Sequence, residues 1–205
     1  MENYAELMFH EAVADLQKAD GSFEKYQVGY RHRTQESLSS DDIGFIQSLN
    51  SFYMATVTPD GWPYVQHRGG ARGILKVVDT QRLVCGDYRG NRQFISMGNL
   101  QASSRVSLFC MDYMNKARLK IQGEAKLQKA SEVAPDVLSL LGKDGPAVER
   151  VLTVEVVAID WNCPKYIPDL FPADVVKQVV AREMQALRQE NAALKAALGE
   201  KDHAG

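Results

Sequence analysis

The segment Arg118–Gln128 constrains the fold more than any other part of this sequence. Apolar or small residues occupy every second position in RLKIQGEAKLQ, and charged or polar residues stand between them. A period of two over this length is typical of a β-strand with one buried face and one solvated face. The chain is therefore expected to build an antiparallel sheet around this strand.

Six further segments have the composition of short strands. Phe52–Thr58 and Pro63–Arg68 flank Pro59-Asp60-Gly61, where proline fixes φ and glycine accepts the left-handed conformation, so a hairpin is predicted. The other four segments are Gly73–Val78, Arg82–Gly86, Arg105–Met111 and Val148–Asp160. Runs of strands with helices at their ends favour a mainly β barrel with α, rather than alternating βαβ units.

Helical spacing or helix start signals occur between these strands. The predicted helices are Ala5–Lys18, a short one from Ser39 to Leu49 with a Ser or Asp cap, Arg92–Gln101 and Ser131–Leu141. Ala19–Thr34 is expected to be an ordered loop, because glycines and tyrosines alternate there with charges.

A long helix is predicted at the C-terminal end, since Ala173–Leu198 contains no glycine or proline. Its apolar seam has heptad spacing at Val180, Met184, Leu187, Asn191, Leu194 and Leu198. An asparagine at an a position favours a parallel two-stranded register, so this helix could pair with a second copy. The alternative is that the helix packs its apolar stripe on its own barrel.

Composition excludes several classes of function. A net charge of −2 gives no basic face for nucleic acid. Cys85, Cys110 and Cys163 are far apart and form no CxxC pair, so neither a metal centre nor a disulfide framework is expected. The acidic N-terminus lacks an apolar signal segment, and no run is long enough to cross a membrane. We expect a cytoplasmic protein.

Glycines and cations are concentrated between Val65 and Leu100. Three glycines precede the strand at Gly73–Val78, and Gly90-Asn91-Arg92 opens a helix that Asn91 could cap. Cations occur here at Arg68, Arg72, Lys76, Arg89 and Arg92. A helix start beside cations attracts anions, so this stretch is expected to cradle a phosphorylated ligand.

Several motifs in this order resemble one family. GWPYVQHRGG, GILKVVD and DYRGNRQFISMGNL, followed later by DWNCPKYIP, are similar to the FMN-binding split-barrel proteins related to pyridoxamine 5'-phosphate oxidase. The resemblance covers roughly Phe45 to Pro168. It implies an antiparallel split β-barrel at 51–170. We expect an N-terminal helical segment at 1–50 to pack on this barrel and a C-terminal helix, a possible coiled coil, to occupy 171–205. The resemblance also implies a homodimer with FMN sites at the subunit interface.

The resemblance further suggests which residues hold the cofactor. The flavin ring edge would meet Arg68, Gly69 and Gly70, and Arg118 would reach it from a neighbouring strand. The phosphate would be held by Lys76, Tyr88, Arg89, Gly90, Asn91 and Arg92, with help from Ser96 and Asn99. Trp161 would either stack on the flavin of the partner subunit or close the end of its own barrel.

The expected function is an FMN-dependent oxidoreductase with an unknown small-molecule substrate, because the flavin itself carries the redox chemistry. No catalytic residue stands out. A flavin carrier or sensor without turnover is an alternative, as is the same barrel with F420 or haem. True pyridoxamine 5'-phosphate oxidases end in an Arg- and Trp-bearing substrate segment, and here a helix takes its place. Pyridoxamine phosphate is therefore not the expected substrate.

Overall fold

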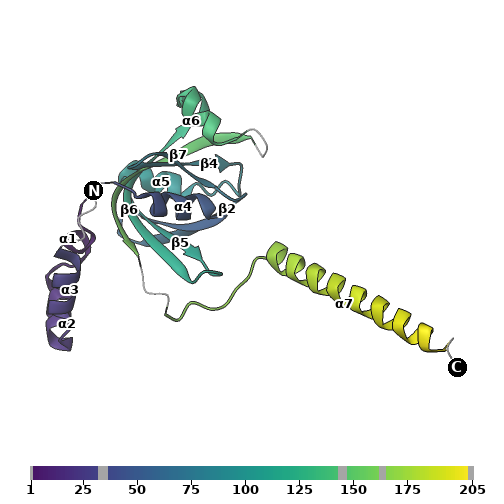
Figure 1. Cartoon of the computed structure of the whole chain (residues 1–205). Helices are drawn as coiled ribbons and strands as arrows, with labels where there is room; N and C mark the ends of the chain where they lie inside the picture. Colours follow the sequence, from purple (N-terminus) through teal and green to yellow (C-terminus); the bar gives the residue numbers. More distant parts are fainter. Residues whose placement is uncertain (1, 32–36, 143–146, 162–164, 203–205) are drawn as a thin grey trace. The chain divides into compact units, whose positions relative to one another are not determined.

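The computed structural model describes residues 2–31, 37–142, 147–161 and 165–202. Its contacts define two compact units, Met1–Asp112 with Ala117–Pro164 and Tyr113–Lys116 with Lys165–Gly205. The first unit holds a curved sheet and the shorter helices (Figure 1). The second holds one long helix, α7 (Ala173–Asp202).

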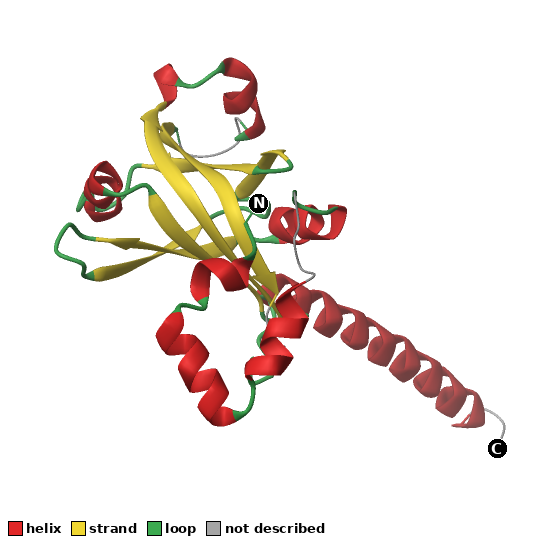
Figure 2. Cartoon of the chain, turned by 90° about the vertical axis from the view of Figure 1, so that its left-hand side faces the viewer, coloured by secondary structure: helices red, strands yellow, loops and turns green. Residues whose placement is uncertain are grey.

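Seven antiparallel strands form one sheet in the first unit, drawn in yellow in Figure 2. Their order across the sheet is β2 (Pro63–Gly69), β1 (Ser51–Val57), β5 (Arg105–Asp112), β6 (Ala117–Lys129), β7 (Val148–Trp161), β4 (Arg82–Tyr88) and β3 (Leu75–Asp79). Because β2 and β3 stand at opposite edges, the barrel is split. The predicted fold class is confirmed, and every predicted strand is present with its ends moved by one or two residues.

The alternation in β6 has its expected cause. Leu119, Ile121 and Ala125 are buried, while the polar residues that alternate with them, Lys120, Gln122 and Glu124, are at least partly open to solvent. The pairing of β6 with β7 shifts register between Gln122 and Gly123. A Cβ at Gly123 would lie 2.7 Å from the Glu155 carbonyl oxygen, so only glycine lets the two strands approach this closely.

Helix α4 (Ser40–Ser48) is closely tied to the barrel. Ile46 is fully buried in the core, which also contains Phe52 and Leu75. The predicted cap is present, because the Ser39 side chain accepts from the Asp42 amide while Asp42 accepts from the Ser39 amide. The strand that begins with Ser51 follows α4 almost at once.

The N-terminal helices differ from the prediction. Instead of one helix over Ala5–Lys18 there are two, α1 (Tyr4–Met8) and α2 (Glu11–Asp20), and α3 (Phe23–Arg31) occupies the predicted loop. Figure 2 shows the three as separate red segments. Phe9 interrupts the helix and packs edge-on against the rings of Tyr26 and Tyr30. These tertiary contacts outweigh the weak local helix pattern. The last part of the predicted loop, 32–34, lies outside the described residues.

Two helices after β4 are shorter than predicted. Helix α5 covers Ile95–Ala102 rather than Arg92–Gln101. The segment predicted as one helix over Ser131–Leu141 is divided into η1 (Ala130–Glu132) and α6 (Pro135–Leu140). Pro135 stands in the first turn of α6, where its missing amide costs no hydrogen bond.

Candidate functional site: an arginine-lined cavity at the end of β4

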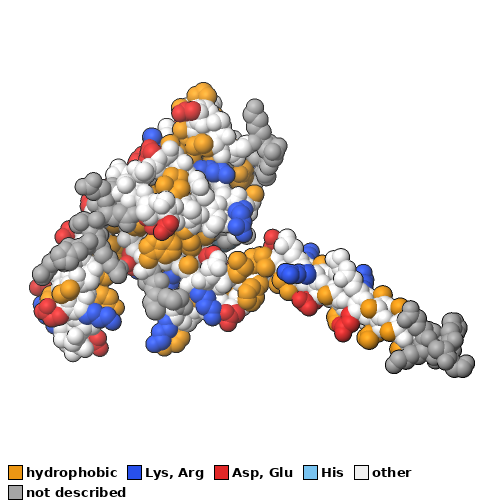
Figure 3. Space-filling model, in the orientation of Figure 1, with side chains coloured by type: hydrophobic (Ala, Val, Ile, Leu, Met, Phe, Trp, Pro, Cys, Tyr) orange, Lys and Arg blue, Asp and Glu red, His pale blue; other side chains and the backbone are white. Residues whose placement is uncertain are grey.

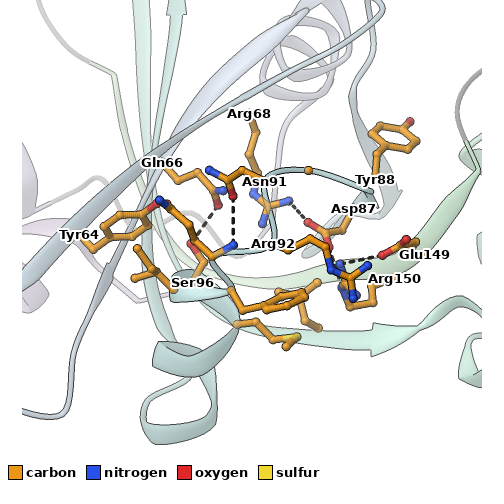
Figure 4. A pocket seen from close by; sticks show the side chains of 16 residues that line it. Tyr64, Gln66, Arg68, Asp87, Tyr88, Asn91, Arg92, Ser96, Glu149 and Arg150 are labelled. Carbon is orange, nitrogen blue, oxygen red and sulfur yellow. Dashed lines mark hydrogen bonds and ion pairs between the residues drawn. The ribbon is translucent and has the colours of Figure 1, made fainter.

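A polar cavity lies where β2, β4, β6, β7 and α5 approach one another (Figure 4). The loop that joins β4 to α5 forms one wall of it. Its lining consists of Tyr64, Gln66, Arg68, Asp87, Tyr88, Gly90, Asn91, Arg92, Gln93, Phe94, Ile95, Ser96, Met97, Leu127, Glu149 and Arg150. Six residues predicted to hold the cofactor are thus brought together here: Arg68, Tyr88, Gly90, Asn91, Arg92 and Ser96.

Two arginines share one carboxylate in this cavity. Arg68 Nη1 lies 2.9 Å from Asp87 Oδ1, and Arg150 Nε lies 2.8 Å from Asp87 Oδ2. The exposed fractions of these side chains are only 9% for Arg68, 18% for Asp87 and 20% for Arg150. The Arg68 Nε is buried and has no hydrogen-bond partner among the described residues. A buried donor without an acceptor is costly, so this atom is suited to a bound ligand.

The described lining carries an excess of positive charge. Three guanidinium groups, those of Arg68, Arg92 and Arg150, stand with two carboxylates, those of Asp87 and Glu149. Arg92 makes no ion pair with any residue that the structure describes. Its guanidinium lies 5.5 Å from the Phe94 ring, and that of Arg150 lies 5.6 Å from the same ring. The cavity can therefore accept an anion.

The loop before α5 is unusual in its backbone. Arg92 and Phe94 both have positive φ, at 62° and 55°, in a region that side chains disfavour. Asn91 does not cap α5 as predicted, because Phe94 occupies the N-cap position. Its side chain instead accepts from the Gln93 amide at 3.2 Å and closes a local turn. Such strain often occurs at ligand-binding loops.

Hydrogen bonds attach α5 to the sheet at two points. Ser96 Oγ donates to Gln66 Oε1 at 2.9 Å on the wall of the cavity (Figure 4). Asn99 Nδ2 donates to Thr56 Oγ1 at 2.9 Å, and both residues are buried. Asn99 therefore fixes the helix from inside the barrel and does not line the cavity.

Lys76 and Arg89 do not line the cavity that Arg92 lines. Lys76 lines a neighbouring pocket with Arg72 and Tyr88, and Tyr88 is shared by both pockets. No described residue forms an ion pair or hydrogen bond with Lys76. Arg89 is exposed and lines neither pocket. Apart from Arg89 and Asn99, the predicted phosphate set is thus divided between two adjacent pockets.

The remaining predicted residues lie away from the cavity lining. Gly69 pairs with Ser51 at the end of β2, and the Gly70 amide donates to the Asn50 carbonyl at 2.9 Å. The Gly70 amide is therefore already engaged within the chain. Arg118 is half-buried on β6, and its Nε has no hydrogen-bond partner.

Trp161 at the end of β7 is held within its own chain. Its indole Nε1 donates to Asp42 Oδ1 at 2.7 Å, and its ring meets Phe45 edge-on at 4.7 Å. These contacts match the second interpretation, in which Trp161 closes the end of its own barrel. The rest of the motif, Asn162–Pro164, lies outside the described residues.

Asp87, Arg150 and Gln66 were missed by the sequence interpretation. Asp87 and Arg150 are direct partners in the β4–β7 register, although 63 positions separate them. Nothing local in the sequence signals this pairing. Gln66 had a usable signal, because Tyr64, Gln66 and Arg68 alternate with exposed residues along β2 and so share one face.

The two described cysteines are not nucleophiles. Burial raises the pKa of the Cys85 thiol to about 11, which the Asp87 carboxylate reinforces and the nearby Arg68 opposes. Burial alone raises the pKa of Cys110 to about 12. Both thiols stay protonated at neutral pH and so lack the reactive thiolate form. Cys163 lies outside the described residues.

Within the part of the chain that the structure describes, two kinds of feature are not found. No three His, Cys, Asp or Glu side chains are grouped so that they could hold a metal ion. None of the described helices has the length and apolar character needed to span a membrane.

Comparison with solved structures gives distant likenesses. A candidate pyridoxamine 5'-phosphate oxidase from Lactobacillus delbrueckii is 20% identical over 62% of this chain and 97% of its own, with a TM-score of 0.49. An FMN-binding protein from Syntrophomonas wolfei is 12% identical over 73% of this chain and 97% of its own, with a TM-score of 0.43. An F420 reductase is 21% identical over 57% of this chain and 94% of its own, with a TM-score of 0.42.

Comparison with curated proteins gives no match. The family model described as pyridoxamine 5'-phosphate oxidase matches residues 44–159, which is more than half of the 205 residues. The matched segment includes all seven strands of the sheet, apart from the last residues of β7. The chain therefore belongs to the pyridoxamine 5'-phosphate oxidase family.

Proposed function

We propose that this chain binds FMN at the arginine-lined cavity and acts as an FMN-dependent oxidoreductase on a small molecule. One observation carries the proposal: Arg92 and the buried Arg68 Nε line the same cavity, and neither has an ion-pair or hydrogen-bond partner in the part of the chain that the structure describes. An anion would compensate the first and an uncharged acceptor the second. A phosphorylated flavin offers both, with a phosphate at one end and ring oxygens and nitrogens at the other.

The residues of the cavity divide into two groups by the partner they would accept. Arg92, Asn91 and Ser96 come from the loop and the first turn of α5, and these would hold the phosphate. Arg68 would donate to the polar edge of the ring. Asp87 holds the guanidinium of Arg68 in place, because it bonds Nη1 and leaves Nε free. Lys76 would reach the same ligand from the neighbouring pocket.

When bound, the flavin supplies the exchange of electrons with the substrate, and the chain supplies position and electrostatics. Arg68 would supply positive charge at the polar edge of the ring and would stabilise negative charge there. Each oxygen of the Asp87 carboxylate is engaged by an arginine, so neither oxygen is directed at a substrate. This assignment leaves the acid or base of the reaction to the substrate, to water or to a partner subunit.

A homodimer with flavin sites between subunits is part of the proposal. The β1–β2 hairpin exposes large apolar side chains: Val57 on β1 at 44%, Val65 on β2 at 61% and Trp62 in the turn between them at 73%. Apolar exposure of this kind on adjacent strands is typical of an interface. Arg118 would then meet the flavin only through the second subunit.

The cavity favours flavin over haem. His67 lies on the opposite face of β2 from Gln66 and Arg68, where its ring meets Tyr53 edge-on at 5.4 Å. Among the described residues, no histidine lines the cavity. F420 also carries phosphate, so competition with FMN in the same titration would distinguish the two flavins.

Flavin titration of single variants tests the placement. A charge-assisted contact contributes roughly 1.5–3 kcal/mol, so Arg92→Ala should weaken FMN binding about ten-fold or more. Riboflavin lacks the phosphate, so its affinity should change much less. Arg105→Ala removes an exposed arginine outside the cavity and is the matched control. Unchanged FMN affinity in both Lys76→Ala and Arg92→Ala would refute this placement of the phosphate.

A further inference from the structure

Helix α7 exposes an apolar seam along its length, seen as orange side chains in Figure 3. Val180, Met184, Leu187 and Leu194 are between 46% and 55% exposed, and Leu198 is 63% exposed. In proteins, most of the stability of a helix comes from packing of its apolar face rather than from helix propensity, and the 30-residue α7 carries such a face. The seam therefore needs a partner surface.

The spacing of the seam identifies the kind of partner. Met184, Asn191 and Leu198 are seven residues apart, as are Val180, Leu187 and Leu194, so they form the a and d positions of about three heptads. A strict a/d seam is narrow and suits one facing helix, whereas packing on a barrel requires a broader apolar stripe. The seam thus points to another helix with the same spacing.

The charges beside the seam are segregated by sign. With Asn191 at an a position, the g positions hold Glu183 and Glu190, and the e positions hold Arg188 and Lys195. None of these four residues has an opposite charge three or four positions away in its own helix. All four are exposed. Their charges are therefore available for a second helix.

The sign pattern selects one arrangement of two copies. In a parallel pair, a g residue meets the e residue five positions later on the other helix. Glu183 would meet Arg188 of the partner subunit, and Glu190 would meet Lys195 of the partner subunit. In an antiparallel pair, g meets g and e meets e, which would place like charges together. Asn191 would also no longer face the same asparagine of the second chain, so its polar side chain would lose its partner in the seam.

We infer that α7 pairs with α7 of a second copy of this chain as a parallel coiled coil in register. Asn191 pairs with its own copy and sets the register, and the two kinds of ion pair exclude the antiparallel alternative. The pairing brings the Ala173 ends of the two helices together. It does not depend on flavin, because none of its residues lines the cavity.

Cysteine crosslinking in the full-length chain tests orientation and register. Met184→Cys and Asn191→Cys are made separately in a Cys163→Ser background, and Gln189→Cys on the outer face of the helix is the control. A disulfide needs closely apposed Cβ atoms, which an in-register parallel pair provides at both a positions. We expect each to crosslink at least about five-fold more than the control under mild oxidation.

The outcomes separate the possible arrangements. An antiparallel pair has one level at which a residue meets its own copy, so it would crosslink at one position at most. That result would overturn the inference, as would yields equal to that of Gln189→Cys. FMN binding is measured on the same samples and should be unchanged. A loss of FMN binding would report failure of the proposed flavin site separately from failure of the helix pairing.

Charge reversal gives an independent test of the ion pairs. One variant carries Glu183→Lys with Glu190→Lys, and the other carries Arg188→Glu with Lys195→Glu. Each places like charges at the seam of its own dimer, whereas a mixture restores opposite charges in a heterodimer. After exchange of subunits, random pairing would give half of the dimers as heterodimer. We expect the heterodimer to exceed this half, as measured by native mass spectrometry of tagged chains. A purely statistical distribution would contradict the ion pairs.

Discussion

Asp87→Asn should destabilise the protein while leaving its affinity for an anionic ligand intact or higher. One carboxylate compensates two guanidinium groups, at 2.9 Å from Arg68 and 2.8 Å from Arg150. Removing its charge leaves Arg68 without a counterion among the described residues, while Arg150 keeps Glu149 at 3.2 Å. The same change removes one negative charge from the cavity lining, which favours binding of a phosphate.

The magnitude follows from the burial of the three side chains. Breaking a buried ion pair costs roughly 3–5 kcal/mol, whereas an exposed pair contributes about 0–1 kcal/mol. All three side chains are at most one-fifth exposed, but asparagine keeps a carbonyl oxygen that one arginine can still use. We therefore expect a loss of about 2–3 kcal/mol in the free energy of unfolding. At roughly 2–4 °C per kcal/mol, Tm should fall by about 4–12 °C.

The assay is thermal and urea unfolding with and without FMN, together with an FMN titration. Asp79→Asn is the matched control, because Asp79 pairs with Arg82 at 2.8 Å but both side chains are more than two-fifths exposed. The control should lose less than about 1 kcal/mol. Equal losses in the two variants would refute the argument from burial, and weaker FMN binding in Asp87→Asn would refute the argument from charge.

Three further predictions concern other parts of the chain. Truncation after Pro172 should leave a dimer that still binds FMN but melts at a lower temperature; light scattering that shows a monomer would make α7 the principal contact. Lys120 loses hydration by burial, yet its contacts with Tyr4 and Asp160 outweigh this and raise its pKa above 10.5. The stabilising effect of the Lys120 charge should therefore be complete at neutral pH and be lost as the pH rises above about 10.5. The difference in the free energy of unfolding between wild type and Lys120→Met should accordingly shrink above that pH. The protein should not oxidise pyridoxamine or pyridoxine 5'-phosphate efficiently, and aldehyde production at about 1 per second or faster would contradict this.

Much of the fold could be predicted because its signals are local. The alternation in Arg118–Gln128, the Pro59-Asp60-Gly61 turn and the Ser39 cap each act over a few residues, and each is present in the structure. Gly61 has φ of 85°, as the turn requires. The helices at the N-terminus were predicted wrongly, because the aromatic contacts of Phe9 and Tyr26 join segments that sequence spacing does not relate.

The site could be predicted only in part, for a related reason. The glycines and cations after β4 are close in sequence, so their gathering at one loop was foreseeable. The partner of Arg68 was not, since Asp87 and Arg150 meet only through the β4–β7 register. Likewise, Lys76 on β3 and Arg92 in the loop before α5 line different pockets, and sequence spacing does not show this.

The absorption spectrum of the purified protein, after incubation with FMN and removal of free ligand by gel filtration, tests the central claim most directly. The account predicts the two bands of oxidised flavin in the near-ultraviolet and the visible, at a stoichiometry near one FMN per chain, and much less retained flavin in Arg92→Ala. A protein that retains no flavin, or one that shows a Soret band instead, would contradict the account.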